Sequence, residues 1–535
     1  MTAQPLPGDP IGYVDRWSAA PKIAVLALSL GAVLISLSRR TVGEEAAHPV
    51  PKAFCGSQDR TESVQGETTF AERFGPGPAK AYHCNLDLVG QFEGEGAGDG
   101  MDIFENCVYY STAENPTMQH PGVAVLDVSD SQHPQATAYL DSPAMLAAYE
   151  SLEIATTRKL LLASKPPTPA AAPFDLYDLS VDCRHPVLKS SISLPRMMSH
   201  AGKFAPDGQT FYGASFDLAT ASAGSRASAV RSDPTAPPAS AVFAIDTSDP
   251  SNPRGIGTWI PPNKAWQTHG VSINRDGTRA YVTLLRVEDD QAKAPNPNGL
   301  VILDVSDLQA RRPHPQFRLI STLFWDDTHI AQFAVPVTIK GRPYLIFTDY
   351  AGAIRLMSPP ADDACDSGRP GHGFARIIDI GDEKHPKTVS KLMLGVDDPT
   401  NYSKVMHDPT LFGAYGSFGC NADDDQNARL LACGYLEGGV RVFDIRDPAR
   451  PREIAYYKPP ARRTQSRPGS VYFQPTRAWS PKDHTADPVM ISPRFRKHGE
   501  EIWFISCDNG FQVVRFTDRF KASHKDLFLR AGKGL

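Results

Sequence analysis

Short runs of apolar and β-branched residues, each closed by aspartate and a small polar residue, recur along the chain. The clearest is residues 299–307 (GLVILDVSD), and residues 122–130 (GVAVLDVSD) nearly repeat it. Five further copies stand at residues 174–182, 241–249, 375–382, 439–447 and 510–518. Val, Ile, Leu and Phe favour buried strands, whereas Asp and Ser side chains turn a chain by bonding backbone groups just ahead of them. Each copy therefore predicts a strand and a turn, and the recurrence predicts a repeat architecture.

A second strand-like run follows most copies, usually after a proline. Proline keeps the residues around it out of the interior of a sheet, so each copy is expected to open a hairpin. These following runs are residues 135–140, 188–194, 317–323 and 453–457. Another hairpin precedes several copies, as the turns Asp207-Gly208 and Asp276-Gly277 indicate. Two hairpins make a four-stranded unit, which is the size of a propeller blade.

The predicted fold is all-β, a seven-bladed β-propeller of four-stranded antiparallel blades over residues 81–520. The blades are expected at residues 81–143, 144–195, 196–261, 262–325, 326–394, 395–460 and 461–520. Residues 39–80 are interpreted as a linker, part of which could supply a strand that closes the ring, and residues 521–535 as a C-terminal tail. An open β-solenoid is the alternative, but long alternating hairpins do not suit its short coils.

An apolar segment near the start of the chain differs from the repeats. Residues 1–22 are a polar region, and residues 23–38 are interpreted as a signal peptide or a membrane anchor. The apolar core of this segment is shorter than the ~20 residues of a membrane-spanning helix, yet no clear cleavage site follows it. We expect the propeller to be exported to an extracytoplasmic location, periplasmic or on the cell surface, and to contact the membrane if the segment is retained.

Charge and cysteine content exclude some classes of function. A formal net charge of -5 with no basic stripe argues against nucleic acid as a partner. Of the eight cysteines, Cys84 with Cys107 and Cys420 with Cys433 each flank a predicted hairpin and could form disulfides. Because the chain lacks a C-x-x-C motif, a thiol redox site or a structural zinc knuckle is disfavoured.

The repeats also resemble a known class of propellers. The strings VAVLDVSD, LVILDVSD and VRVFDIRDPARP are similar to the repeat that names the LVIVD-repeat β-propeller proteins. They resemble blade ends of the selenium-binding protein and methanethiol oxidase family as well. The resemblance covers roughly residues 81–520 and implies a β-propeller, but it leaves the biochemical role open. The Cys-rich motifs associated with selenium-binding proteins are not apparent, so that family's activity is not carried over.

Histidines recur at the head of the predicted first strand of each blade. His200, His269 and His329 align directly, and Glu150 takes the equivalent place in one blade. Three further histidines can be aligned with them, His83, His407 and His484. Because the first strand of each propeller blade lines the central channel, these side chains are expected to form a ring about the axis.

Two interpretations of this ring follow. Neutral imidazoles bind transition metals, so a subset of the six histidines would hold a metal ion, with Cu or Fe favoured and Zn or Mn possible. We expect the ligands to be His200, His269, His329 and His484, with His83 and His407 as alternates. Glu150 would then be the catalytic side chain, orienting a ligand or accepting a proton, in an oxidoreductase that acts on a small molecule. In the alternative, the histidines are structural and a non-enzymatic propeller binds a protein partner or a ligand through its face loops.

Overall fold

The structure is a computed structural model of the 535-residue chain. It describes residues 48–528 except 70, 73–74, 76–77, 114, 149, 165–172, 195–196, 198, 217–239, 264, 286–296, 353–369, 406–414, 463, 474–485 and 492. The predicted signal peptide or anchor, residues 23–38, lies outside this range. Among the described residues, no helix has the length and apolar character needed to cross a bilayer.

Seven antiparallel sheets make up the described part of the chain. The first three are β3 (Met101–Phe104), β4 (Cys107–Tyr110), β5 (Val123–Asp127) and β6 (Gln135–Leu140); β7 (Glu153–Ala155), β8 (Leu160–Ser164), β9 (Pro173–Asp178) and β10 (Val187–Ser193); and β11 (Ala201–Phe204), β12 (Thr210–Phe216), β13 (Ser240–Asp246) and β14 (Arg254–Trp259). The next two are β15 (Gln267–Ile273), β16 (Arg279–Leu285), β17 (Asn298–Asp304) and β18 (Arg318–Trp325); and β19 (His329–Ile339), β20 (Arg342–Ala351), β21 (Ala375–Asp379) and β22 (Lys387–Leu392).

The last two sheets each take in a strand from the N-terminal side. They are β23 (Gly419–Ala422), β24 (Leu430–Gly434), β25 (Val440–Asp444) and β26 (Arg452–Lys458) with β1 (Tyr82–Cys84); and β27 (Arg494–Arg496), β28 (Glu501–Ser506) and β29 (Gly510–Phe516) with β2 (Leu86–Phe92). The described helices are short: α3 (Ser306–Gln309), α5 (Tyr402–Val405), α6 (Asp518–Ser523) and α7 (Lys525–Phe528), with single 3-10 turns at Met145–Ala147, Gly395–Asp397, Pro399–Asn401 and Lys497–Gly499.

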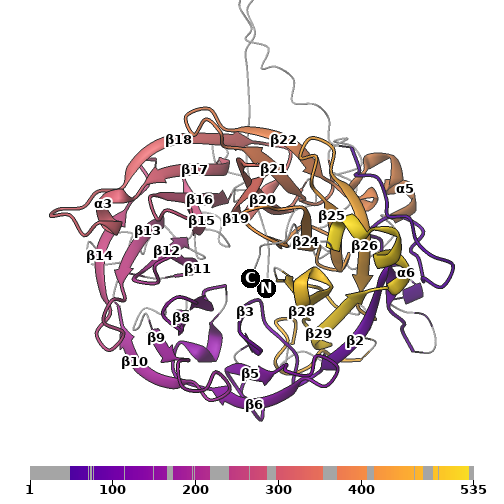
Figure 1. Ribbon diagram of the computed structural model, residues 1–535, viewed down its shortest axis with the longest axis horizontal. Helices are drawn as coiled ribbons and strands as arrows, with labels where there is room; N and C mark the ends of the chain where they lie inside the picture. Colours follow the sequence, from indigo (N-terminus) through magenta and orange to yellow (C-terminus); the bar gives the residue numbers. More distant parts are fainter. Residues whose placement is uncertain are drawn as a thin grey trace, which may run out of the picture. The chain divides into compact units, whose positions relative to one another are not determined.

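The sheets are arranged in a ring, which confirms the predicted seven-bladed propeller (Figure 1). In each blade the first strand lies nearest the centre and the fourth lies outside, as β15 and β18 show. Neighbouring blades pack their apolar faces together. Val242 on β13 and Val301 on β17, for example, belong to one buried cluster. Because each sheet is covered on both faces, the third strands are largely apolar, as the sequence pattern predicts, although β21 and β25 each carry a buried arginine.

The aspartates that close the repeat perform the turn role predicted for them. Asp127 ends β5, and its carboxylate accepts the backbone N–H of Ser129 at 2.9 Å. Asp130 then accepts the N–H of Gln132 and bonds His133. The same first contact recurs in five other blades, from Ser180 to Asp178, Ser248 to Asp246, Ser306 to Asp304, Gly381 to Asp379 and Arg446 to Asp444. The repeat is therefore a strand followed by side-chain-stabilised turns.

The ring is closed by a strand from before the first repeat. β2 pairs with β29 from Leu86 opposite Phe516 to Phe92 opposite Phe511 and so completes the last blade. β1 pairs with the outer strand β26 of the preceding sheet. Thus the first strands of the predicted blade 81–143 belong to the two last sheets, and the innermost strand of the first blade is β3.

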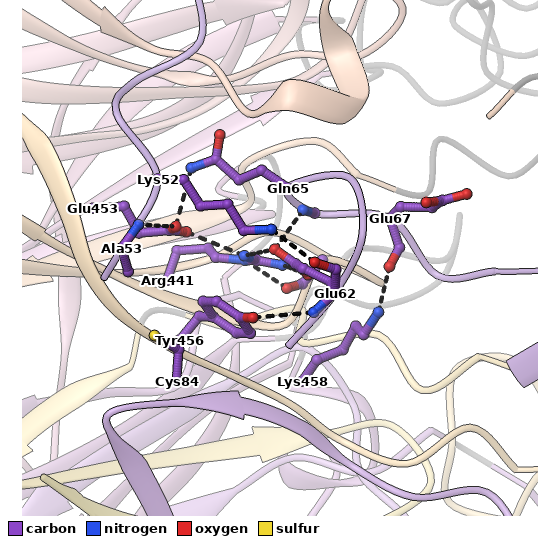
Figure 2. A network of polar contacts seen from close by, with 12 residues as sticks. Lys52, Ala53, Glu62, Gln65, Glu67, Cys84, Arg441, Glu453, Tyr456 and Lys458 are labelled. Carbon is purple, nitrogen blue, oxygen red and sulfur yellow. Dashed lines mark hydrogen bonds and ion pairs between the residues drawn. The ribbon is translucent and has the colours of Figure 1, made fainter. Parts of the chain in front are cut away.

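The residues ahead of β1, interpreted above as part of a linker, include a segment packed on the sheet of β23–β26 (Figure 2). Arg441 on β25 is completely buried and donates to Glu62 at 2.6 and 2.8 Å and to Glu453 at 3.1 Å. Gln65 and the backbone of Ala53 donate to the same Glu453 carboxylate. Burial alone would raise the pKa of Glu62, but the attraction and hydrogen bonds of Arg441 outweigh it and lower that pKa. This buried network attaches the segment to the propeller.

Three disulfides join described cysteines. The Cys420–Cys433 bridge across β23 and β24 was predicted and is confirmed. The Cys84–Cys107 pair, which the sequence allowed, is wrong, because each of these cysteines bonds a different one. Cys84 bonds Cys55 in the N-terminal segment. Cys107 bonds Cys183 in the turn of the neighbouring blade.

Candidate metal centre

The pairing registers define which residues of the inner strands are equivalent. In six blades the aspartate that ends the third strand lies opposite a residue at or near the start of the second strand, as Asp246 lies opposite Thr210. Thr210 is bonded in turn by Ala205 at the end of the first hairpin. Counting back the same number of residues from the equivalent of Ala205 in each blade gives one position per blade, near the start of the inner strand. Arg515 takes the place of the aspartate in the last blade.

This position carries polar side chains in five consecutive blades and apolar ones in the other two. In blade order the residues are Asp99, Glu150, His200, His269, Gln332, Phe418 and Ile491. The residue from which the count starts is Phe104, opposite Cys107, in the first blade and Val337, opposite Tyr344, in the fifth. The polar part of this layer thus spans five of the seven blades.

Three members of the layer form a compact donor group. The Nε2 atoms of His200 and His269 lie 3.7 and 3.9 Å from Oε2 of Glu150, and the two imidazole centroids are 4.6 Å apart. One ligand atom from each residue lies within 4.8 Å of both others. Ligand atoms that share a bound ion at ~2.1 Å stand roughly 3–3.5 Å apart. A small contraction of this group would therefore hold a metal ion.

The position of His269 follows from an irregularity in β15. The register of β15 against β16 shifts between Thr268 and Val271, so His269 and Gly270 fall in a bulge. Such bulges re-aim a side chain. The Nδ1 atom of His269 lies 3.3 Å from the carbonyl oxygen of Gln332, to which it can donate. That bond would leave Nε2, the atom facing Glu150, as the acceptor and therefore as the metal-binding nitrogen.

Glu150 and His200 are held together by a contact between two blades. The backbone of Glu150 forms an isolated parallel β-bridge with Ala201, the first residue of β11. Next to it the Ser151 hydroxyl bonds the Ser199 hydroxyl at 2.8 Å and the His200 carbonyl at 3.1 Å. These contacts join the chain entering the second blade to the start of the third blade's inner strand. The two side chains are therefore positioned by backbone and hydroxyl groups.

Burial governs the protonation of the donor group. Burial, and then the charge of Asp99, raises the pKa of Glu150 well above its ordinary value. Burial lowers the pKa of His200 to about 4, and burial together with the charge of His200 lowers the pKa of His269 well below its ordinary value. Glu150 is 7% exposed, and its Oε2 accepts no hydrogen bond from the described part of the chain. A bound cation would be coordinated by the neutral imidazoles and would satisfy the buried carboxylate oxygen.

An axial cavity of about 450 Å³ adjoins the donor group through Glu150. Residues of the innermost strand of every blade line it. It extends from Asp99 and Glu150, which precede β3 and β7, to Pro206 and Asp425, in the turns that follow β11 and β23. Its volume is within the range of small-molecule sites. A small molecule in this cavity would reach Glu150.

The remaining histidines of the predicted ring do not join this group. His83 lies on β1 at the outer edge of a sheet, 3.5 Å from Asp59, so its predicted axial place is wrong. His329 begins β19 and is buried, but Gln332 occupies the equivalent position in that blade. His407 and His484 lie outside the described residues.

The structure also changes the role expected of Glu150 and adds residues to the site. Glu150 lies close enough to both imidazoles to be a ligand, whereas the sequence suggested only an orienting or proton-accepting role. The sequence did not single out Asp99 and Gln332, because the predicted site was based on histidines at similar places in the blades. The pairing register of the first hairpin in each blade identifies both residues. Tyr350 was missed as well; burial and the nearby Glu150 charge raise its pKa.

Comparisons with known proteins add no family. No protein-family model matches the chain, and no curated protein matches it. Solved structures similar to it include Kuenenia stuttgartiensis hydrazine synthase (12% identity, 80% of this chain and 96% of that chain, TM-score 0.45). Others are the Myceliophteria thermophila Cps50 (Swd1) β-propeller domain (10%, 81% and 100%, 0.46) and the Pseudomonas aeruginosa periplasmic gluconolactonase PpgL (12%, 81% and 92%, 0.42). At these values the likenesses carry no argument about activity. The chain is a seven-bladed β-propeller with a candidate Glu/His/His metal centre beside its axial cavity.

Proposed function

We propose that this protein is an exported, LVIVD-type β-propeller that binds one transition-metal ion through Glu150, His200 and His269. The bound ion would serve the oxidation or reduction of a small molecule that enters the axial cavity. The observation that carries the proposal is the convergence of three donor atoms from three separate parts of the chain, within 4.8 Å of one another, in a buried layer.

The donor set narrows the metal. Two imidazoles and one carboxylate with open positions are typical of non-haem iron(II) sites, and two histidines with a glutamate also bind zinc. We therefore favour iron(II) over copper, zinc and manganese. Such an ion supplies electron transfer and a binding position for a co-substrate. The protein supplies the rest: the Gln332 carbonyl orients His269, and the Ser151–Ser199 contact holds Glu150 beside His200.

Export is part of the proposal. Disulfides persist in oxidising compartments and are rare in the cytosol, and six described cysteines form three bridges. The LVIVD assignment is supported by the repeat strings and by the aspartate-capped turns that they form. Neither export nor the LVIVD assignment bears on the metal, so either of them can be refuted without refuting the metal centre.

Metal analysis tests the proposal directly. Purified protein is loaded separately with iron(II) under anaerobic conditions and with copper(II), zinc(II) or manganese(II), desalted, and analysed by mass spectrometry of the metal. We expect about one equivalent of iron in the wild type. Removal of one ligand, by Glu150→Gln or His269→Ala, is expected to weaken binding roughly a hundredfold or more.

A matched control is available on the surface. His133 is an exposed histidine in the turn between β5 and β6, where it bonds Asp130 at 2.8 Å. His133→Ala is expected to retain the metal in full. If no preparation of the wild type holds a stoichiometric metal, the metal centre is refuted and the non-enzymatic propeller becomes the better interpretation.

A further inference from the structure

The walls of the axial cavity carry an excess of acidic groups. Its lining includes five carboxyl groups and two cationic side chains: Asp99, Asp102, Glu150, Glu153, Asp425, Lys203 and Arg494. Apolar side chains such as Phe333, Val335 and Ile491 lie between them. The cavity therefore offers both a charged and an apolar environment to one small molecule.

Both cationic side chains already face carboxylates of the wall. The Lys203 ammonium lies 2.7 Å from Glu153, and the Arg494 guanidinium lies 3.7 Å from Asp102. Asp102 is itself held by the backbone N–H groups of Ile103 and Ile154 at 2.9 and 2.8 Å. An anionic ligand would have to compete with these internal carboxylates for either cation, which disfavours anions as occupants.

Two of the other acidic groups, Asp99 and Glu150, are not balanced in this way. Among the described lysines and arginines, none forms an ion pair with either of them. Burial raises the pKa of Asp425, but the charges of Lys203 and Arg494 oppose that rise. Asp99 and Glu150 occupy the equivalent position in adjacent blades, and both line the cavity. One oxygen of Glu150 is buried without a hydrogen-bond donor from the described chain. A metal ion at Glu150 would satisfy that carboxylate and leave Asp99 facing the cavity.

We propose that the axial cavity binds a small cationic amine, whose ammonium group donates to Asp99 and whose hydrocarbon part packs on Phe333, Val335 and Ile491. This deepens the proposed function, since it names the substrate class, and it rests on that function only for the metal that stands beside the amine. A carboxylate without a cation in a semi-enclosed cavity is stabilised by a charge-assisted hydrogen bond from an ammonium group.

Three probes with one carbon frame test the class of ligand. Benzylammonium, benzyl alcohol and benzoate are titrated into the full-length wild type, metal-free and metal-loaded, and binding is followed by ligand-observed NMR. We expect benzylammonium to bind roughly ten times or more tighter than benzyl alcohol, the range of one hydrogen bond to a charged group. Benzoate is expected to bind most weakly. Equal binding of the ammonium and the alcohol, or preference for benzoate, overturns the proposal.

Variants locate the binding group. Asp99→Asn is expected to lower benzylammonium affinity about tenfold or more and to leave benzyl alcohol binding unchanged. Asp87→Asn, on the outer strand β2, removes the same charge from an exposed site and is expected to change neither. An unchanged affinity in Asp99→Asn overturns the assignment of that residue. If Asp99→Asn does not fold, the comparison of the three probes on the wild type still decides the ligand class.

The two proposals fail in distinguishable ways. Metal content is measured in the same wild-type preparations. A protein that holds no metal but prefers benzylammonium refutes the metal centre and keeps the amine site. A protein that holds one metal but shows no preference among the probes refutes the amine site alone.

Discussion

Arg441 is buried between two carboxylates, and its replacement by methionine should strongly destabilise the propeller. In Arg441→Met, the side chains of Glu62 and Glu453, which are 1% and 0% exposed, lose their shared cation. Breaking a buried ion pair by removing one partner costs about 3–5 kcal/mol. We expect a loss of this size in the free energy of unfolding at pH 8.

The loss should depend on pH in a defined direction. Without Arg441, burial and mutual repulsion raise the pKa of both carboxyl groups in the folded variant above their values in the unfolded chain. The folded variant then binds more protons than the unfolded chain above pH ~4.5, so its stability falls as pH rises. Each carboxyl lowers the stability of the variant by about 1.4 kcal/mol per pH unit across the range between its unfolded and folded pKa values.

Urea unfolding followed by circular dichroism at pH 5.5 and pH 8.0 measures both effects. Arg450→Met is the control, because Arg450 is 85% exposed and pairs with a half-exposed Asp447; its loss should cost less than about 1 kcal/mol. Adding Glu62→Gln and Glu453→Gln to Arg441→Met should restore much of the stability. A variant as stable as the wild type, or a deficit that is equal at both pH values, would refute the reasoning.

Three further predictions concern the site, the cavity and the N-terminal segment. A Cβ on Gly270 would lie 2.6 Å from the Gln332 carbonyl oxygen, so Gly270→Ala should displace the group that orients the neighbouring histidine and lower metal affinity at least tenfold; unchanged metal content would contradict this. Burial raises the pKa of Glu153 to about 7, so the folded protein retains a proton that the unfolded chain releases, and stability should fall by up to ~3 kcal/mol as pH rises from about 4.5 to 7. Glu153→Gln should flatten that slope in urea titrations, and an unaltered slope would exclude this carboxyl as its source. Cys84→Ala opens a disulfide to Cys55 with a sequence separation of 29, which should cost roughly 3–4 kcal/mol and speed trypsin cleavage before β1; equal cleavage rates would show that the bridge does not hold this segment.

The sequence predicted the propeller because its repeat unit is local. Each strand is followed at once by the aspartates that turn it, so the hairpins are visible without knowing their neighbours. Ring closure was not predictable in this way. β2 pairs with β29, which is far from it in the sequence, and no feature of residues 86–92 identifies β29 as the partner strand. The same reason explains the wrong partner predicted for Cys84, since β1 joins a sheet made mostly of later residues.

The candidate site was predicted only in part, because the blades were aligned by residue type. His200, His269 and Glu150 occupy equivalent positions both in the strand registers and in the alignment of the blade sequences. His83 was aligned in place of Asp99, although a two-residue turn between β3 and β4 shortens that hairpin. In β19 the true equivalent, Gln332, is not a histidine and therefore attracted no attention. Chemistry that depends on distance, such as a carboxylate acting as a ligand, requires the closed ring.

The pairing of β2 with β29 also has a consequence for biosynthesis. A ribosome delivers Leu86–Phe92 long before Gly510–Phe516, the strand with which these residues must pair. Until then the nascent chain carries an unpaired strand with exposed backbone groups, which is the kind of edge that other chains can join. Folding of the final blade must therefore wait until β29 has been translated, and a premature stop before β28 would leave the ring without its last blade.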